Sequence, residues 1–296
     1  MSGTYKATGI TLKSAPFGEN DRLLTILTPE QGLVRAVAPG ARKHQSRLRG
    51  RSGIFVVNRL LLNRGRSLDK VLQADSINSF PKLSQDLGKL TAGQYLAELA
   101  LAQALSQQPQ TELFTLLQAH LERLDSCGRG ATPAFLVHGI FHLLALDGIA
   151  PQVHTCCLTQ QPLIPQLSNP DWRVGFAASL GGAFRLDVAA PQPASSASAA
   201  PESEPPPESR PVVLEQPKIY SRLTALPLIL LQQLSRAALL QPDGTLLPAI
   251  AAEVLGHSQA QVEKDVWLSL ERTLRHYLQY HIDKTIHSAA LIESCF

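Results

Sequence analysis

Between Gln31 and Leu68 the sequence contains no aspartate or glutamate, although nine lysines and arginines fall in the same stretch. Residues 1–80 hold 13 basic and 5 acidic side chains, whereas the whole chain has a net charge of only +3. The remainder of the chain is therefore net acidic. Charge separated in this way predicts that the first eighty residues bind a polyanion.

Cysteines and long apolar runs are also scarce. The four cysteines, two of them adjacent, form no recognisable pairing framework, which favours a reducing compartment. The longest apolar run, residues 134–150, is interrupted by two histidines and an aspartate, and residues 1–14 lack a signal-peptide core. We expect a cytoplasmic, nucleoid-associated protein without membrane contact.

The usual motifs of catalysis are missing. The sequence has no P-loop, no helix-opening GxGxxG and no HExxH. His154, Cys156 and Cys157 lack the second ligand pair of a structural zinc site. Glu19 and Asp21 lie close together, but their position indicates a loop that they solvate or cap. We expect no catalytic residue, no cofactor and no bound metal.

The first eighty residues have the pattern of β-structure. Apolar alternation is bounded by turn sequences such as "PEQG" and "NRGRS". The predicted strands are Tyr5–Ser14, Arg22–Thr28, Leu33–Pro39, Gly53–Asn63 and Leu68–Ile77. Five short strands with one long basic loop are typical of an OB-fold barrel, which binds oligonucleotides. A small antiparallel sandwich is the alternative.

From residue 81 the apolar period becomes helical. One stripe runs through Leu113, Leu117, Leu121 and Leu124, and a second through Leu136, Ile140 and Leu144, with Gly148 ending that helix. A third stripe runs from Val262 to Tyr277. We therefore predict an α+β chain of two domains, an OB fold over residues 1–80 and an all-helical domain over residues 81–296.

Two segments interrupt the helical domain. Residues 151–188 are irregular and rich in proline and glycine. Residues 189–211 consist almost entirely of alanine, serine, proline and glutamate, and we expect them to be a disordered insertion because they cannot bury enough apolar surface.

The basic side chains are the candidate binding residues. Aromatic rings are few in residues 1–80, so affinity should come mainly from phosphates, read without sequence preference. Phe17 is the ring that we expect to be exposed for base stacking, and Phe55 the one in the core. The predicted DNA-binding residues are Arg35, Arg42, Lys43, Arg47, Arg49, Arg51, Arg59, Arg64 and Arg66.

Several segments together resemble the bacterial recombination mediator family RecO. They are "FGENDRLLTILTPEQGLVRAVAPGARK" (residues 17–43), Ser46, "LLLNRGRSL" (residues 60–68) and "YLQYHIDKTIHSAALI" (residues 277–292). The resemblance implies an N-terminal OB fold, a helical C-terminal domain and a non-enzymatic role in DNA repair. That role is to bind single- and double-stranded DNA, to anneal complementary strands and to help RecA displace single-strand-binding protein.

The resemblance also implies partners. They are RecR, the acidic C-terminal tail of single-strand-binding protein, which the helical domain would hold, and RecA indirectly. Many members of the family carry four zinc cysteines. Here Cys156 keeps the first position, while Thr159, Arg185 and Val188 stand at the others, so the segment resembles a degenerate zinc finger.

Two other functions compete with this interpretation. One is a metal-dependent enzyme that processes nucleic acid, with Glu19 and Asp21 as metal ligands. The other is an RNA-binding assembly factor that combines the barrel with a helical docking domain.

Overall fold

The structure of the protein is a computed structural model that describes residues 3–189, 219–256, 261–282 and 284–296. The chain forms two compact units, one of residues 1–150 and 233–296, the other of residues 151–232. Nearly all of the predicted insertion, residues 190–211, lies outside the described residues. No helix in the described ranges is long and apolar enough to span a membrane.

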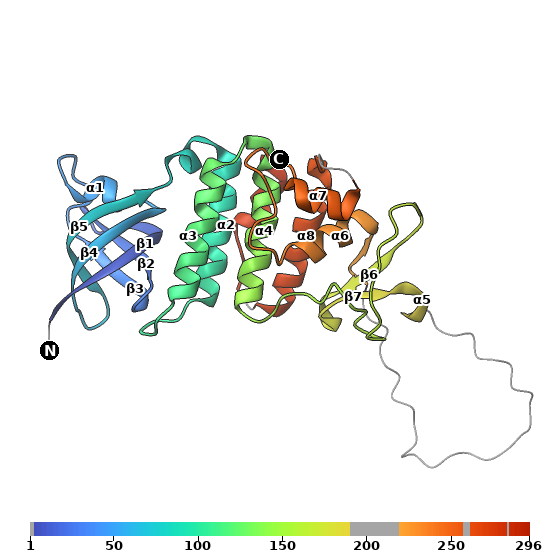
Figure 1. The fold of residues 1–296 in the computed structure, drawn as a ribbon. Helices are drawn as coiled ribbons and strands as arrows, with labels where there is room; N and C mark the ends of the chain where they lie inside the picture. The colour runs from blue at the N-terminus through green and yellow to red at the C-terminus, as the bar shows by residue number, and fades with distance from the viewer. Residues whose placement is uncertain (1–2, 190–218, 257–260, 283) are drawn as a thin grey trace, which may run out of the picture. The chain divides into compact units, whose positions relative to one another are not determined.

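The first unit begins with a closed five-stranded barrel (Figure 1). Its strand order is β1-β2-β3-β5-β4, with β3 and β5 parallel and the other pairs antiparallel. The bounds are β1 (Thr4–Phe17), β2 (Asp21–Thr28), β3 (Gly32–Ala38), β4 (Val56–Asn63) and β5 (Asp69–Ser79), with the short helix α1 (Leu48–Arg51) between β3 and β4.

Alternating side chains fill the barrel. On β3, burial alternates along the strand, so that Val34 and Ala36 point inward and Arg35 outward. Leu24, Ile26 and Leu62 join them in one apolar cluster. All five predicted strands are confirmed to within three residues at each end, and closure of the barrel excludes the two-sheet sandwich.

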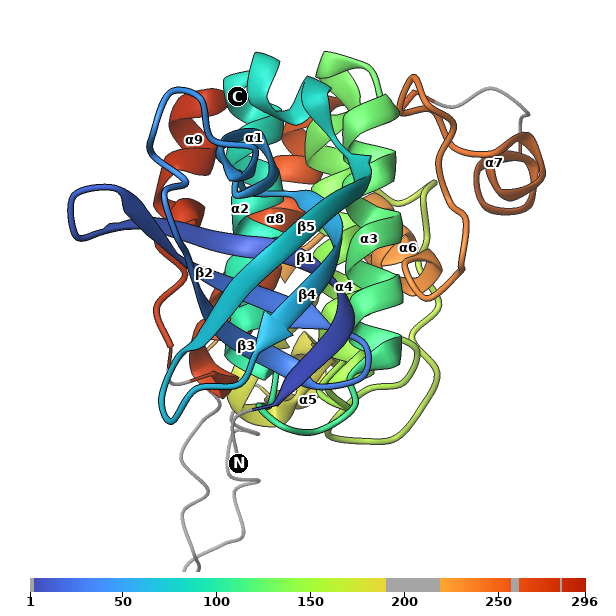
Figure 2. The same ribbon diagram turned by 90° about the vertical axis from the view of Figure 1, so that its left-hand side faces the viewer.

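Helices form the rest of the first unit, and α2, α3, α4 and α8 lie side by side (Figures 1 and 2). The leucine stripes predicted for α3 and α4 are buried, and Gly148 follows α4 at a φ of +75°. The third predicted stripe begins at Val262, two residues before the start of α8. The elements are η1 (Pro81–Gln85), α2 (Leu87–Gln103), α3 (Thr111–Ser126), η2 (Arg129–Ala131), α4 (Thr132–Leu146), α7 (Pro248–Leu255), α8 (Lys264–His281), η5 (Ser288–Leu291) and α9 (Ile292–Cys295).

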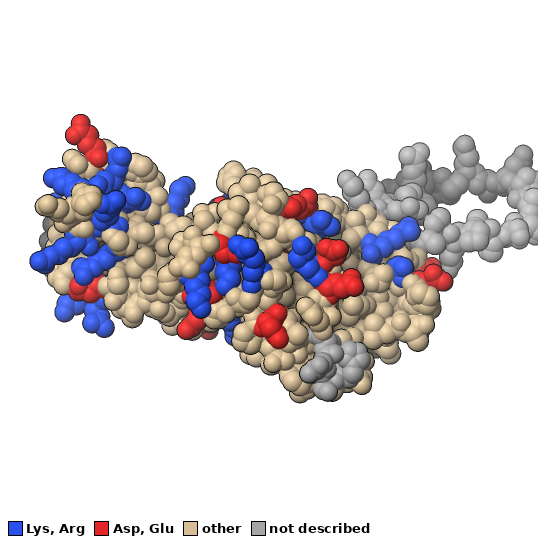
Figure 3. All heavy atoms as spheres, turned by 90° about the horizontal axis from the view of Figure 1, so that it is seen from above, with Lys and Arg blue, Asp and Glu red and all other residues tan. Residues whose placement is uncertain are grey.

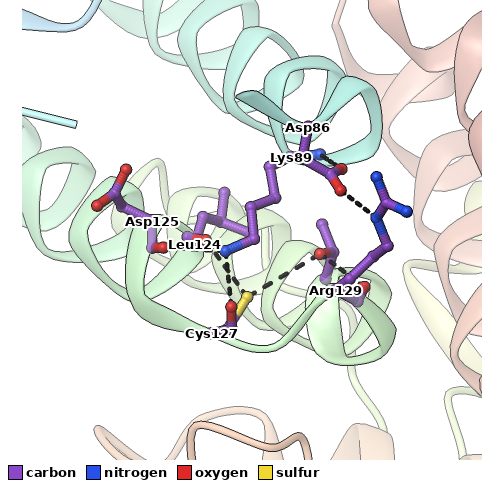
Figure 4. A network of polar contacts seen from close by, with 7 residues as sticks. Asp86, Lys89, Leu124, Asp125, Cys127 and Arg129 are labelled. Atoms are coloured by element: carbon purple, nitrogen blue, oxygen red, sulfur yellow. Dashed lines mark hydrogen bonds and ion pairs between the residues drawn. The ribbon is translucent and has the colours of Figure 1, made fainter. Parts of the chain in front are cut away.

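A buried lysine connects the start of α2 with the end of α3 (Figure 4). The Lys89 ammonium donates to the carbonyl oxygens of Asp125, at 2.9 Å, and Cys127, at 2.6 Å. These carbonyls lie at the C-terminal end of α3, where a cation is favoured. Asp86 caps α2 by accepting from the Lys89 amide at 3.0 Å, and its carboxylate also pairs with Arg129. The Arg129 guanidinium holds the pKa of Asp86 below its usual value.

The barrel is attached to the helices through the turn between β2 and β3. The Leu33 amide donates to the Leu105 carbonyl at 2.9 Å, and the Gln110 amide donates to the Pro29 carbonyl at 2.8 Å. Gly32 has a φ of +63°, and a Cβ atom there would overlap the Leu105 carbonyl oxygen. Glycine is therefore required where the turn meets the chain after α2.

The second unit contains a three-stranded sheet, ordered β7-β6-β8. Strands β6 and β7 lie within residues 151–188, whose irregular sequence predicts no strand. Cys156 is buried, and its sulfur accepts from the Arg185 amide at 3.3 Å. In the described ranges, no three His, Cys, Asp or Glu side chains are placed to hold a metal ion. The elements are β6 (Val174–Ala177), η3 (Ala178–Leu180), β7 (Gly182–Arg185), α5 (Leu186–Ala189), β8 (Ser221–Leu223) and α6 (Ala225–Gln233).

Candidate nucleic-acid interface

The loop between β3 and β4, residues 39–55, carries most of the predicted cations and is fixed to the neighbouring turn. Asp21 Oδ1 accepts from the Gly40 amide at 2.7 Å. The Arg42 amide donates to the Asn20 carbonyl at 2.8 Å, and Arg42 Nη1 donates to the Gly18 carbonyl at 3.0 Å. Residues 39–55 and the β1–β2 turn therefore form one surface, which we call the loop face.

The loop directs its cations outward. Leu48, in α1, packs against the barrel core, while Lys43, Arg47 and Arg49 are exposed. Arg51 is half-exposed, with its guanidinium 3.7 Å from the Asp75 carboxylate on β5. Within the described parts of the chain, this is the one ion pair that involves the barrel. Among the described residues, no acid of the helical part forms an ion pair with a loop cation.

Figure 3 shows the resulting charge distribution. Blue side chains crowd the barrel, whereas blue and red alternate over the helices in that view. Screened surface charges of one sign attract a polyanion at range and bind its phosphates at contact. The charge that gathers on the barrel is therefore of the sign that attracts a phosphate backbone.

The two predicted aromatic assignments agree with the structure. Phe17 is 43 % exposed at the end of β1, next to Gly18, whose carbonyl holds Arg42. Phe55 is 3 % exposed and faces Gly93 of α2. A flat exposed ring beside guanidinium groups is the arrangement that single-strand-binding surfaces use.

Three of the other four predicted cations lie away from the loop face, whereas Arg59 is the cross-strand neighbour of Asp75, the acid that pairs with Arg51. Arg59 is exposed on β4, opposite Thr8 of β1 and Asp75 of β5. Arg35 projects from β3, and Arg64 and Arg66 belong to the turn between β4 and β5. The structure thus separates residues that the sequence places in one basic stretch.

Arg35, Arg64 and Arg66 meet around a hollow of about 210 Å³, which we call the arginine hollow. The Arg64 guanidinium carbon lies 5.1 Å from the centre of the Tyr5 ring, and the Tyr5 hydroxyl donates to Asp69. Burial and the Asp69 carboxylate raise the pKa of Tyr5, which keeps its hydroxyl protonated. Sequence reasoning missed Tyr5, because its contacts with Arg64 and Asp69 depend on strand pairing.

The acids proposed as metal ligands have other partners or stand apart. Asp21 is occupied by the Gly40 amide, and Glu19 is exposed in the turn. Their arrangement supports the capping role and gives the metal-dependent enzyme no observation in its favour.

Comparison with known proteins relates both parts of the chain to one family. Residues 1–80 match the family description "Recombination protein O N terminal", and residues 84–201 match "Recombination protein O C terminal". The chain is 52 % identical to the DNA repair protein RecO of Acaryochloris marina, covering 100 % of this chain and 96 % of the relative.

Two further relatives carry the same printed name. The chain is 48 % identical to the protein of Nostoc sp. PCC 7120, covering 100 % of this chain and 97 % of the relative. It is 41 % identical to that of Synechococcus elongatus PCC 7942, covering 99 % and 96 %. These matches run through the barrel, the helices and the second unit, and the chain belongs to the RecO family.

Proposed function

We propose that this protein is a non-catalytic recombination mediator in DNA repair, which binds DNA through the phosphates of its backbone. The observation that carries the proposal is the loop face, where Lys43, Arg47 and Arg49 are exposed on an anchored loop and form no ion pair with any acid in the described part of the chain. The family supports the same role, since the relatives named above are DNA repair proteins.

The strand order supports the assignment of the barrel as an OB fold, and the position of Cys156 supports a degenerate zinc finger in the second unit. On an OB fold, backbone contacts leave base edges free to pair with a second strand. Annealing of complementary strands follows from that arrangement. By binding such strands, the protein would also assist the loading of RecA onto DNA that is coated with single-strand-binding protein.

The family resemblance supports the partners. We infer that RecR and the acidic tail of single-strand-binding protein bind this chain, that RecA is engaged indirectly, and that the protein works in the cytoplasm at the nucleoid. Co-purification of the tagged protein with RecR and single-strand-binding protein tests the two direct partners. Loss of both proteins under DNA-free conditions would contradict direct binding.

A salt titration of DNA binding tests the proposal. The variant K43Q/R47Q removes two exposed charges from the loop face, and K82Q/R222Q removes one lysine and one arginine that are exposed outside the barrel. Each lost phosphate contact with duplex DNA lowers the slope of log K against log salt by about 0.9. We expect the slope to fall by about 1.8 in K43Q/R47Q, equally for unrelated sequences, and to stay unchanged in K82Q/R222Q.

Two results would contradict the proposal. Equal slopes in the two variants would show that the loop face does not bind phosphates. A loss confined to one DNA sequence would show that the loop reads bases.

A further inference from the structure

The arginine hollow is formed by four segments that are distant in the sequence. Tyr5 comes from β1, Arg35 from β3, and Arg64 and Arg66 from the β4–β5 turn. Gln107, which follows α2, completes one wall. The hollow therefore exists only in the folded first unit.

The charge of the hollow is positive. Asp69 is the acid among its lining residues, and both of its carboxylate oxygens are occupied. Oδ1 accepts from the Gly65 amide at 2.9 Å, and Oδ2 accepts from the Tyr5 hydroxyl. Three guanidinium groups thus surround one engaged carboxylate. Guanidinium is the group that best matches a phosphate, because its donors form a planar fork.

The walls of the hollow are fixed by backbone contacts. The Gln107 amide donates to the Gln31 carbonyl at 2.9 Å, and the Arg64 amide donates to the Gly3 carbonyl at 3.0 Å. A Cβ atom at Gly65 would overlap the Leu68 carbonyl oxygen, so the turn that carries Arg64 and Arg66 is tight. A site whose walls are already ordered loses little entropy when it binds.

The hollow and the loop face lie at opposite ends of β2. The loop face is joined to the β1–β2 turn, before Asp21, whereas the hollow includes Gln31, after Thr28. The 8 residues of β2 span on the order of 25 Å at the usual rise along a strand. In Figure 2, α1 and the β4–β5 turn likewise lie at opposite ends of the barrel. A single phosphate cannot contact both sites.

We propose that the arginine hollow is a second DNA site, which holds the phosphate backbone of another strand while the loop face holds the first. The proposal rests on the proposed function and extends it. Two strands on one barrel have an effective concentration in the millimolar range, far above that of dilute strands in solution. The two sites together would promote annealing without any catalytic group.

Native mass spectrometry at low salt tests the proposal by counting strands on each chain. The full-length protein is mixed with two non-complementary oligonucleotides of different mass, each about eight nucleotides long, within the usual range for one OB fold. The variants are R35Q/R66Q for the hollow, K43Q/R47Q for the loop face and K82Q/R222Q as the matched control. Arg64 is left intact because it packs on Tyr5.

Because neither site reads the base sequence, we expect the unaltered chain and the control to carry two strands in total, with complexes that hold one strand of each mass among them. Each site variant should carry only one strand in total and should anneal complementary strands at least tenfold more slowly. Circular dichroism and melting temperature confirm that the variants are folded.

Three outcomes would overturn the inference. A single strand on the unaltered chain, weakened in both site variants, would mean that one strand follows a continuous path. Two strands on R35Q/R66Q would mean that the hollow does not bind DNA. Absence of any strand on the unaltered chain would instead refute the proposed function itself.

Discussion

Glu271 is a carboxylate buried among the helices, 1 % exposed on α8. Burial raises its pKa to about 7, although the Arg275 guanidinium lies 3.2 Å from Oε2 and lowers it. Glu293 also faces the carboxylate and raises the pKa, whereas Arg272 and the Tyr95 hydroxyl lower it. The native state therefore retains a proton on this carboxyl group at pH values where the unfolded chain has released it.

We predict that E271Q changes how stability depends on pH. A pKa that is higher in the folded state than in the unfolded state contributes stability at low pH, and this is lost as pH rises from about 4.5 through 7. The free energy of unfolding of the unaltered chain should therefore fall relative to E271Q, by on the order of 3 kcal/mol between pH 4.5 and 8. Urea denaturation across this range measures the difference.

Comparison with E271Q also cancels the contribution of three histidines, whose effect on stability has the opposite pH dependence. Burial lowers the pKa values of His120, His138 and His142, that of His138 to about 3. These three side chains destabilise the native state as pH falls below about 6.5, but they do so in both proteins. A difference in unfolding free energy that is constant across the pH range would show that Glu271 is charged in the folded state.

At the scale of elements, Gly32 controls how the barrel joins the helices. Gly32 and Gly18 have nearly the same backbone φ, at +63° and +60°. At Gly18 an added Cβ atom meets nothing within 4 Å, whereas at Gly32 it overlaps the carbonyl oxygens of Leu105 and Gln108. Alanine substitutions at these two glycines therefore separate the energetic cost of the left-handed backbone from the cost of the atomic overlap.

We predict that G18A costs about 1 kcal/mol of unfolding free energy, the usual penalty of a left-handed conformation for a residue with Cβ. G32A should cost at least about 3 kcal/mol, because the turn must also move away from residues 105–108. Urea denaturation of the two variants provides the test. Equal costs would show that the turn adjusts freely and does not determine the junction.

The strands could be predicted from the sequence because alternation and turn residues are local signals. The start of β4 was less predictable. The predicted strand began at Gly53, but Phe55 has a φ of +61° and the ladder starts at Val56. An aromatic residue in a left-handed conformation has no sequence signal, since tertiary packing against α2 imposes it.

The sequence predicts nine DNA-binding cations but does not predict how they group in space. Arg42 and Arg64 lie in one acid-free stretch, yet they belong to the turns before β4 and after it. Which turns share an end of a barrel depends on strand order, here β1-β2-β3-β5-β4, and composition carries no information about it. In the second unit, β6 and β8 pair although residues 190–218 separate them in the chain, and such a non-local pairing also lacks a local signal.

At the scale of the whole molecule, the chain forms two compact units with separate cores. Phe184 is fully buried in the second unit, where a Cβ atom on Gly175 would collide with its ring. In the first unit, a Cβ atom on Gly139 of α4 would lie 2.9 Å from Leu96 Cδ1. Two alanine substitutions can therefore mark the unfolding of each unit separately.

We predict two unfolding transitions in scanning calorimetry. G175A should lower the midpoint temperature of the second unit's transition, and G139A should lower that of the first unit's transition. The DNA sites proposed above lie within the first unit, and a ligand raises the stability only of the unit that binds it. Duplex DNA at about one hundred times its Kd adds about 2.7 kcal/mol, which corresponds to a shift of about 5–10 °C for a unit of this size. The shift should occur in the transition that G139A lowers. If DNA instead raised the transition that G175A lowers, the phosphates would be bound by residues 151–232, and the barrel would not be the DNA-binding part of this protein.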